Sequence, residues 1–564
     1  MNRNTIIILF FAPLLVFVMP LFAGESDGGK RLWVYAPVNF QVDKDTDRLI
    51  ALLKRSAKAG YNGAVVTDYK FGKLDGRPRH YYRNLERTRQ AAEQLKIELI
   101  PAVMPIGYSN SILQNNPNLA AGLPVKDCLF VVSGTEAKVP QDNLLPGGAF
   151  ETAARRMPSG WDWIDGFGAS TRLDRQHKHS GQSSLLMHDF RKGNSHGNCR
   201  VVKRVSLKPF HQYRFTMWVK TDALGGSEFK FMPLTAAGPL NYANIGVKPT
   251  QDWKRHRVVF NSLNNKDAKI YIGVWSGRTG SIWIDDVRLE EVGGVNLLRR
   301  DGCPIHVRSS DGSVEYQEGR DYKRWADPKL GNIPWLGDYD DDHDAPPIRL
   351  TTNSRIRDGD RLRVSFYHTV MVYDGQVCCS LVADELFTHL RRQIELIKRY
   401  LKPKRYFMSH DEIRVAGYDE LAKGRPAGKL LAENVGRCVK LIHDVHPGAQ
   451  VLVWSDMFDP HHNAHDNYYL VRGTLAESWL GLAPSVGIMN WNGGKSKQSL
   501  AFFAERGHQQ IIAGYYDGDV AGNIRKWRAA TEGVKGVNGF MYTTWRNNYD
   551  ALEEFARRLR ESSR

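Results

Sequence analysis

One alternation of strands and helices occurs twice in this chain of 564 residues, once near each end. Between residues 31 and 105, three apolar runs rich in β-forming residues are separated by amphipathic helical patterns. The same rhythm resumes at residue 384 and continues to residue 561. Strands that alternate with helices at this pitch form parallel βα units. The two ends therefore predict one α/β architecture that is interrupted in the middle.

The number of predicted strands indicates how this sheet closes. The first part predicts three strands, at residues 31–38, 63–67 and 97–105. The second part predicts five more, at 405–409, 451–455, 486–491, 510–515 and 539–544. Three strands alone would leave open sheet edges, whereas eight can close. We therefore predict a (β/α)8 TIM barrel interrupted after its third strand, with two separate α/β domains as the alternative.

Between the two barrel parts the pattern changes to short alternating runs with turn residues between them. Runs at 213–219, 253–260, 269–275 and 281–289 alternate as strands buried on one face do. This pattern predicts an all-β jelly-roll sandwich, followed by a small β-rich segment. The predicted boundaries are 31–125 for the first barrel part, 143–293 for the sandwich, 294–375 for the small β-rich segment and 384–564 for the second barrel part.

Residues 1–23 have the features of an export signal. Arg3 supplies the positive start, Ile6–Phe22 is almost unbroken apolar sequence, and Ala23 precedes a polar segment. We predict a secreted or periplasmic protein with no stable membrane span after removal of the signal. An uncleaved anchor is the alternative, because the apolar run approaches the ~20 residues that a membrane span needs.

The net charge and the aromatic content limit the classes of molecule that the protein is expected to bind. The formal net charge is +17, which favours an acidic partner. Fourteen Trp and 23 Tyr side chains offer flat faces of the kind that stack on sugar rings. The basic residues lack the aromatic interleaving of nucleic-acid-binding modules, so we expect no nucleic acid. The expected substrate is a polysaccharide or glycan, in one interpretation an anionic one.

In a barrel of parallel strands the active site lies where the strands end. The candidates at or just past the predicted strand ends are Tyr35, Asn39, Asp68, His410, Asp411, Glu412, Trp454, Asp456, Asn490, Trp491, Tyr515, Tyr516, Asp517 and Trp545. Asp411 and Glu412 are the strongest signal, because two adjacent carboxyl groups in a partly desolvated pocket cannot both ionise freely and one pKa rises. A carboxyl group still protonated near neutral pH can protonate a glycosidic leaving group. The structural alternative is that the pair caps the next helix.

Four segments at these strand ends resemble one enzyme family. They are Tyr406–Glu412, Val453–Asp456, Tyr515 and Gly539–Trp545, and they resemble the family 20 glycoside hydrolases, the β-N-acetylhexosaminidases. The resemblance implies that Glu412 is the general acid/base and that Asp411 orients the 2-acetamido group of the substrate. Tyr515, or Tyr516, would hydrogen-bond the acetamido oxygen. His410, the three tryptophans, Asp456 and Asp68 would bind substrate, and the reaction would be substrate-assisted.

Other functions remain open at this point. Without an acetamido group, a second carboxylate must act as nucleophile or base, and Asp456, Asp68 and Asp517 are the candidates. The substrate would then be a neutral or anionic galactan-type polysaccharide, cleaved with retention or inversion. A third interpretation is a non-catalytic carbohydrate-binding protein on a degenerate barrel.

The predicted sandwich carries its own resemblance. Asn143–Glu151, His179–Leu185 and Trp283–Leu289 resemble family 4 and 9 carbohydrate-binding modules. The resemblance implies a module that holds polysaccharide near the barrel, with a structural calcium ion bound by Glu151 and Asp286. Oxygen ligands suit calcium, and surface salt bridging is the alternative. No cofactor is expected for catalysis.

Two further features bear on metal binding. The six cysteines are scattered, with no Cys-x-x-Cys pair and no zinc-type spacing. His461–Asp466 contains three histidines, but no fixed zinc signature matches it. We interpret it as a polar loop that contacts substrate.

Overall fold

The computed structural model describes residues 31–154, 157–226, 228–331, 335 and 337–561 of the chain. The predicted export signal, residues 1–23, lies outside this part. Among the described helices, none has both the length and the apolar character needed to cross a bilayer.

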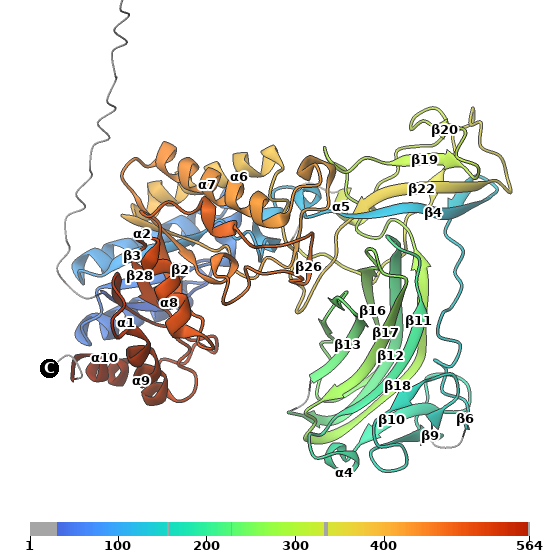
Figure 1. Cartoon of the computed structure of the whole chain (residues 1–564), viewed down its shortest axis with the longest axis horizontal. Helices are drawn as coiled ribbons and strands as arrows, with labels where there is room; N and C mark the ends of the chain where they lie inside the picture. The colour runs from blue at the N-terminus through green and yellow to red at the C-terminus, as the bar shows by residue number, and fades with distance from the viewer. Residues whose placement is uncertain (1–30, 155–156, 227, 332–334, 336, 562–564) are drawn as a thin grey trace, which may run out of the picture. The chain divides into compact units, whose positions relative to one another are not determined.

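Eight parallel strands close into a barrel (Figure 1). They are β1 (Arg31–Pro37), β2 (Gly63–Thr67), β3 (Glu98–Val103), β23 (Arg405–Met408), β25 (Gln450–Trp454), β27 (Gly487–Asn490), β28 (Gln510–Ile512) and β29 (Val537–Tyr542). β1 pairs with β29 to close the sheet. β3 pairs directly with β23, so the whole inserted region leaves and re-enters between two neighbouring strands.

The long helices belong to the two barrel segments. They are α1 (Asp43–Lys58), α2 (Arg79–Gln94), α6 (Asp384–Leu401), α7 (Ala427–Val445), α8 (Ser496–Glu505), α9 (Val520–Thr531) and α10 (Leu552–Glu561). In α6, Leu386, Leu390, Ile394 and Ile397 are buried at helical spacing, which forms one apolar stripe against the core. Acidic residues in its first turn and basic residues in its last complement the helix dipole.

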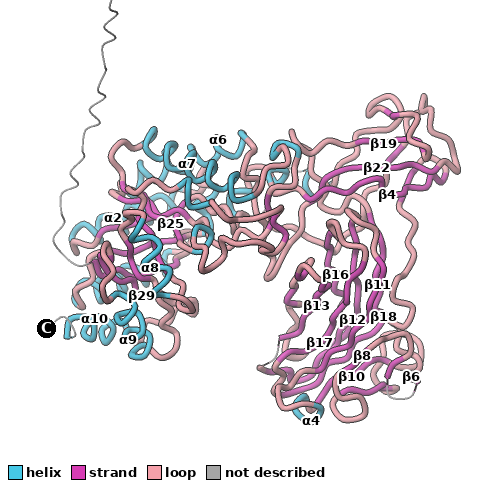
Figure 2. Tube along the Cα trace, viewed as in Figure 1, coloured by secondary structure: helices cyan, strands magenta, loops and turns pink. Residues whose placement is uncertain are grey.

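The predicted fold class, a (β/α)8 TIM barrel with an inserted jelly roll, is wrong. Between β25 and β27 the structure describes no α-helix, only two 3₁₀ turns (Asp456–Phe458 and Ser478–Gly481) and the short strand β26 (Leu470–Val471). The described chain is β-rich, with twenty-nine strands against ten α-helices, three of which have only four residues (Figure 2). The reason is that the inserted sheets contribute most of the strands, and that polar loop sequence replaces an amphipathic helix after β25.

Two antiparallel sheets form the inserted sandwich. One has the order β16 (Gln251–Asn261), β12 (Gln212–Gly225), β18 (Thr279–Val292), β10 (Ser184–His188), β9 (Thr171–Asp174). The other has the order β14 (Gly238–Pro239), β13 (Glu228–Thr235), β17 (Asp267–Trp275), β11 (Cys199–Ser206), β8 (Trp163–Ile164), with β15 (Ala243–Asn244) paired to β13. Phe215 of the first sheet stacks on Phe231 of the second at 4.0 Å, and both are fully buried, so the inner faces meet there.

A third sheet is assembled from both flanks of the sandwich sequence. Its order is β20 (Glu315–Tyr316), β19 (His306–Ser309), β22 (Arg361–His368), β4 (Leu123–Ser133), β5 (Glu136–Lys138), β21 (Ile348–Arg349). β4 and β5 precede the sandwich and the other four strands follow it. The remaining short elements are α3 (Asn110–Leu113), α4 (Phe190–Gly193), α5 (Pro328–Gly331) and the pairs β6 (Ala153–Ala154) with β7 (Met157–Pro158) and β24 (Val415–Ala416) with β26.

The inside of the barrel is a hydrophobic cluster of its own. Phe407 of β23 has no exposed surface there, and its ring meets the edge of Trp454 at 4.8 Å. Removal of a buried phenyl ring from such a close-packed interior leaves a cavity that neighbours fill only in part.

We therefore expect Phe407→Ala to lower the free energy of unfolding by about 3–5 kcal/mol in denaturant titrations. Leu480→Ala is the matched control, because Leu480 is 71% exposed and its truncation should change that free energy by less than about 0.5 kcal/mol. Equal losses in the two variants would contradict a packed barrel interior.

Candidate active site

A cavity of about 520 Å³ lies at the carboxyl ends of the barrel strands. Six of the residues predicted from the sequence line it: Asp68, Asp411, Glu412, Trp454, Trp491 and Trp545. They follow or end five different barrel strands, so closure of the barrel brings them together.

The loops after β3 and β23 pack backbone to backbone and place the two adjacent carboxyl groups. Ser409 N donates to Val103 O at 2.8 Å, and Ile106 N donates to Ser409 O at 3.0 Å. A Cβ atom on Gly107 would lie 1.8 Å from Asp411 O, so only glycine allows this approach. Glu412 itself has a left-handed φ of 48°, a strained conformation that neighbouring contacts must hold.

Asp456 lies beneath this pair and has no exposed surface. Its Oδ2 accepts hydrogen bonds from Glu412 N and from Asn463 Nδ2, both at 2.9 Å. Its Oδ1 accepts one from Trp491 Nε1 at 3.3 Å. Burial raises the pKa of Asp456 to about 7, and the nearby charge of Glu412 acts in the same direction, although the hydrogen bonds oppose the shift.

Asp411 lines the cavity, and its pKa is raised more than that of Asp456. Burial and, after it, the negative charges of Asp456 and Glu412 together raise its pKa from the ordinary value to about 8. Titration is shared within the cluster, so the proton belongs to the group of acids more than to one oxygen. A carboxyl group whose pKa is raised in this way is suited to donate a proton near neutral pH.

Glu412 has the opposite environment, because a cation compensates its charge. Arg414 Nη2 lies 2.8 Å from Glu412 Oε2, and the Tyr108 hydroxyl donates to the same oxygen. The guanidinium is almost fully buried and lies over the rings of Tyr373 and Tyr469 at 4.7 and 5.2 Å. The guanidinium and the phenol hydroxyl thus hold the Glu412 carboxylate in one orientation.

Aromatic rings form the walls and the rim of the cavity. Tyr35 lies 5.4 Å from the Trp545 ring and 6.4 Å from the Trp454 ring, and Trp491 lies 6.5 Å from Trp454. Trp545 is 57% exposed, which leaves its face open to a ligand. Large amphipathic rings of this kind bind apolar faces while polar edges remain solvated.

Several residues of the site were not selected from the sequence. Tyr69 and Tyr108 line the cavity and lie two and five residues beyond the ends of β2 and β3. Arg414 lies six residues beyond the end of β23 and pairs with Glu412 without lining the cavity. The sequence pattern does not give the course of these loops. Tyr69 directly follows Asp68, so a wider window after each predicted strand would have included it. Arg414 could have been flagged as the cation nearest in sequence to Asp411 and Glu412.

Other predicted residues lie away from the cavity. The ring of His410 is fully buried and its Nε2 lies 3.2 Å from Asn434 Oδ1 on α7. Tyr516 is buried against Tyr542 and Phe555, and Tyr515 is exposed but does not line the cavity. The reason is that β28 ends at Ile512, three residues before the predicted end, so both tyrosines follow a loop.

Two of the alternative carboxylates have structural partners. Asp68 lines the cavity, but its carboxylate accepts from Phe40 N at 3.0 Å, Lys70 N at 2.9 Å and the Tyr81 hydroxyl at 3.1 Å. Asp517 accepts from Trp545 N at 2.7 Å and from the Thr544 hydroxyl. Asp517 therefore holds the loop that carries a wall of the cavity.

The predicted calcium residues meet one loop of the sandwich. Glu151 Oε2 accepts from Gln182 N at 2.7 Å. Asp286 lies 2.6 Å from His179 Nδ1 and accepts from the Ser180 hydroxyl at 2.8 Å. Both carboxylates thus contact residues 179–182, and calcium binding there stays a prediction.

No family model matches the sequence, and no curated protein matches it. Several solved structures are similar to parts of the chain. The carbohydrate-binding module TmCBM61 in complex with β-1,4-galactotriose is 20% identical over 26% of this chain and 97% of that one, with a TM-score of 0.21. A CBM4 structure is 13% identical over 26% and 99%, with a TM-score of 0.20.

The similarity to a third structure extends over most of the chain. A rhamnosidase from Novosphingobium sp. PP1Y is 11% identical over 93% of this chain, with a TM-score of 0.31. The chain spans 55% of the length of that enzyme. The similar structures thus include carbohydrate-binding modules and one glycoside hydrolase.

The raised pKa values of Asp411 and Asp456 predict how the free energy of unfolding changes with pH. Their pKa values are raised above the value of about 3.9 for an unfolded aspartate, so the folded chain binds more protons between pH 4 and pH 8. Their contribution to stability is fully present below pH 4 and is lost as the pH rises through 7 to 8.

Asp456→Asn removes one of these acids, so the free energy of unfolding of the variant relative to the wild type should increase between pH 4 and pH 8. Denaturant titrations across that range test this. Asp466→Asn, on the exposed part of the same connection, should give a curve parallel to that of the wild type. A parallel curve for Asp456→Asn would disprove the buried-acid interpretation.

Proposed function

We propose that this protein is a glycoside hydrolase that acts on a polysaccharide or glycan. One observation carries the proposal: a cavity walled by aromatic rings contains Asp411, a buried carboxyl group whose pKa is raised, beside Glu412, a carboxylate that forms an ion pair with a buried guanidinium. Hydrolysis of a glycosidic bond requires this pair of functions, an acid for the leaving oxygen and negative charge for the anomeric centre.

In the proposed reaction, Asp411 donates its proton to the glycosidic oxygen as the bond breaks. Glu412 stabilises the positive charge that develops on the sugar ring, or attacks the anomeric carbon to form a glycosyl ester. A water molecule then adds its oxygen to the anomeric carbon and gives a proton back to Asp411, which releases the sugar and, where the ester has formed, frees Glu412. Asp456 acts through Asp411, because its buried position helps to keep that carboxyl protonated. These roles invert those that the family 20 resemblance implied, where Glu412 donates the proton.

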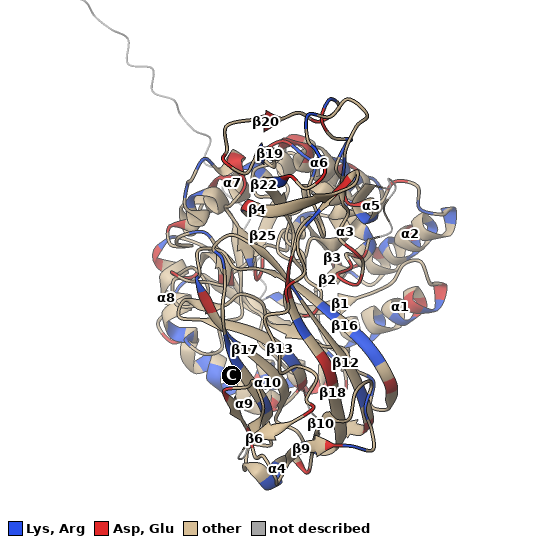
Figure 3. Cartoon of the chain, turned by 90° about the vertical axis from the view of Figure 1, so that its right-hand side faces the viewer, with Lys and Arg blue, Asp and Glu red and all other residues tan. Residues whose placement is uncertain are grey.

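The substrate unit proposed for this cavity is an uncharged sugar. Among the described residues that line the cavity there are three acids, Asp68, Asp411 and Glu412, and no Lys or Arg. A uronate or sulfate would meet like charge there. Along the ribbon in Figure 3, Lys and Arg positions alternate with Asp and Glu positions over many elements.

A 2-acetamido sugar is the finer proposal. It satisfies the requirement for an uncharged unit, and its carbonyl oxygen would need a hydrogen-bond donor in the cavity. The hydroxyl predicted for this role, that of Tyr515, lies outside the cavity lining, whereas Tyr108 places a hydroxyl beside Glu412. We therefore assign that contact to Tyr108, whose hydroxyl proton turns from Glu412 to the acetamido oxygen when the sugar binds.

The wider proposal includes the parts around the barrel. The sandwich would bind polysaccharide and raise its local concentration at the cavity. Glu151 and Asp286 would bind a structural calcium ion, and residues 1–23 would direct export. No cofactor takes part in the proposed reaction.

The first test compares variants on a panel of aryl glycosides and polysaccharides. Asp411→Asn and Glu412→Gln should each lower kcat by about 10²–10⁴-fold, because each removes a charge or proton without change of shape. Tyr515→Phe is the control and should retain the wild-type rate. Full activity of both acid variants would exclude the proposal, and a large loss in Tyr515→Phe would favour the family 20 arrangement.

The second test is the pH profile of kcat/KM. In Asp456→Asn, Asp411 loses a neighbouring negative charge, so its pKa should fall and the alkaline limb of the profile should move to lower pH. An unchanged alkaline limb would show that Asp411 is not the group that must be protonated.

A further inference from the structure

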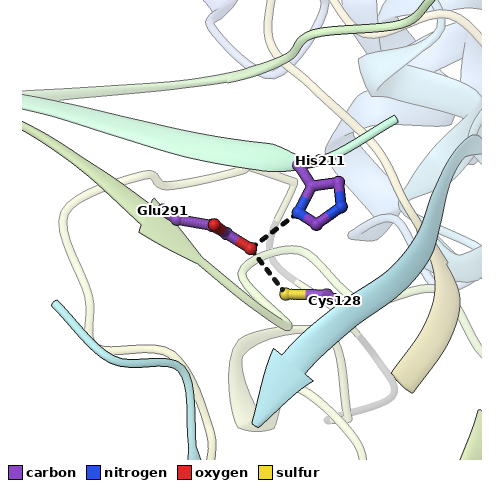
Figure 4. Close-up of side chains that lie close together, drawn as sticks. All are labelled: Cys128, His211 and Glu291. Carbon is purple, nitrogen blue, oxygen red and sulfur yellow. Dashed lines mark hydrogen bonds and ion pairs between the residues drawn. The ribbon is translucent and has the colours of Figure 1, made fainter. Parts of the chain in front are cut away.

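A second cluster of reactive side chains lies outside the cavity. Cys128 is on β4, His211 immediately precedes β12, and Glu291 is near the end of β18 (Figure 4). Cys128 Sγ lies 3.2 Å from Glu291 Oε1, and His211 Nδ1 lies 2.6 Å from the same oxygen. One donor atom of each residue lies within 4.8 Å of the others, and within the described ranges no other group of Cys, His and acidic residues meets this condition.

The donor atoms form a chemically specific set. A thiol sulfur, an imidazole nitrogen and a carboxylate oxygen are the three ligand types of protein-bound zinc. Tetrahedral zinc places such atoms about 3.3–3.6 Å apart. The sulfur–oxygen distance of 3.2 Å lies just below this range, and the nitrogen–oxygen distance of 2.6 Å needs to open by less than about 1 Å.

The surroundings hold these side chains in place. Cys128 and His211 are buried, and Glu291 is mostly buried. Glu291 Oε2 accepts from Lys208 Nζ at 2.7 Å, which fixes the carboxylate and leaves Oε1 toward the other two ligands. His211 N donates to Ser262 Oγ at 2.9 Å. Glu291 also lines a cavity of about 450 Å³, through which an ion and a water molecule could reach a fourth coordination position.

The cluster lies where two sheets meet. Cys128 belongs to the third sheet, whereas His211 and Glu291 belong to the sandwich. Polar contacts already join these sheets nearby, among them Lys126 N to Phe210 O at 2.9 Å and Asn261 Nδ2 to Pro124 O at 3.0 Å. A metal ion bound here would cross-link two sheets that the cavity chemistry does not use.

We propose that Cys128, His211 and Glu291 bind a zinc ion that clamps the third sheet to the sandwich. On binding, the Cys128 thiol loses its proton to solvent and forms a sulfur–zinc bond, and His211 coordinates through its unprotonated Nδ1. No oxidation or reduction takes place. The proposal does not depend on the hydrolase function.

The test uses the full chain, stripped with a chelator and titrated with Zn²⁺ alone or with Co²⁺ alone as a spectroscopic probe. We expect one tightly bound ion per chain, a thiolate-to-cobalt charge-transfer band, and a Tm that rises with added Zn²⁺. Cys128→Ser should abolish the band and weaken Zn²⁺ binding at least tenfold. Cys199→Ser is the matched control, because Cys199 is, like Cys128, a buried free cysteine, and it lies on β11 of the sandwich. This variant should retain the charge-transfer band and the Zn²⁺ affinity.

If Cys128→Ser does not fold, a second variant tests zinc binding. Glu291→Gln keeps the shape of the side chain and its contact with Lys208 can be replaced by a neutral hydrogen bond, so this variant should fold and still lose zinc-dependent stabilisation. Near-UV circular dichroism reports whether each variant is folded. Absence of a stoichiometric ion in the wild type, or equal zinc affinity in the wild type and both variants, would overturn the proposal.

Discussion

The candidate site depends on the crowding of three carboxyl groups in one desolvated region. Asp456 is fixed beneath the pair by the backbone amide of Glu412, and Arg414 matches the charge of Glu412. A region of low polarity cannot hold three negative charges with one compensating cation, so a proton stays in the cluster. The pKa of Asp411 therefore depends on all three carboxyl groups, and a substitution of one of them changes the pKa values of the others.

The inserted region supports this arrangement through a residue that neither barrel segment contains. Gln376 lies just before α6, and its side-chain nitrogen donates to Gly107 O at 3.0 Å and to Glu412 O at 2.8 Å. Its side-chain oxygen accepts from Arg414. One amide thus connects the loop after β3, the loop after β23 and the compensating cation. The end of the insertion is in this sense part of the site.

The sequence predicted those site residues whose position depends only on where a single strand ends. The ends of β23, β25 and β27 follow clear apolar runs, so Asp411, Glu412, Trp454 and Trp491 could be placed at one edge of the barrel. His410 was predicted to bind substrate but faces α7, because a single residue decides whether a side chain points to the cavity or to that helix. The partnership of β4 with β22 also escaped prediction, since antiparallel strands more than two hundred residues apart leave no local signal.

The direct pairing of β3 with β23 has a consequence for how the chain is made. The partner of β3 leaves the ribosome about 300 residues after β3 itself, once the sandwich and the third sheet have been synthesised. Until then the first three strands present an unpaired edge with apolar side chains. Ring closure must therefore be a late and slow event, governed by long-range contacts, and the nascent N-terminal segment is the part of the chain that most needs protection from aggregation.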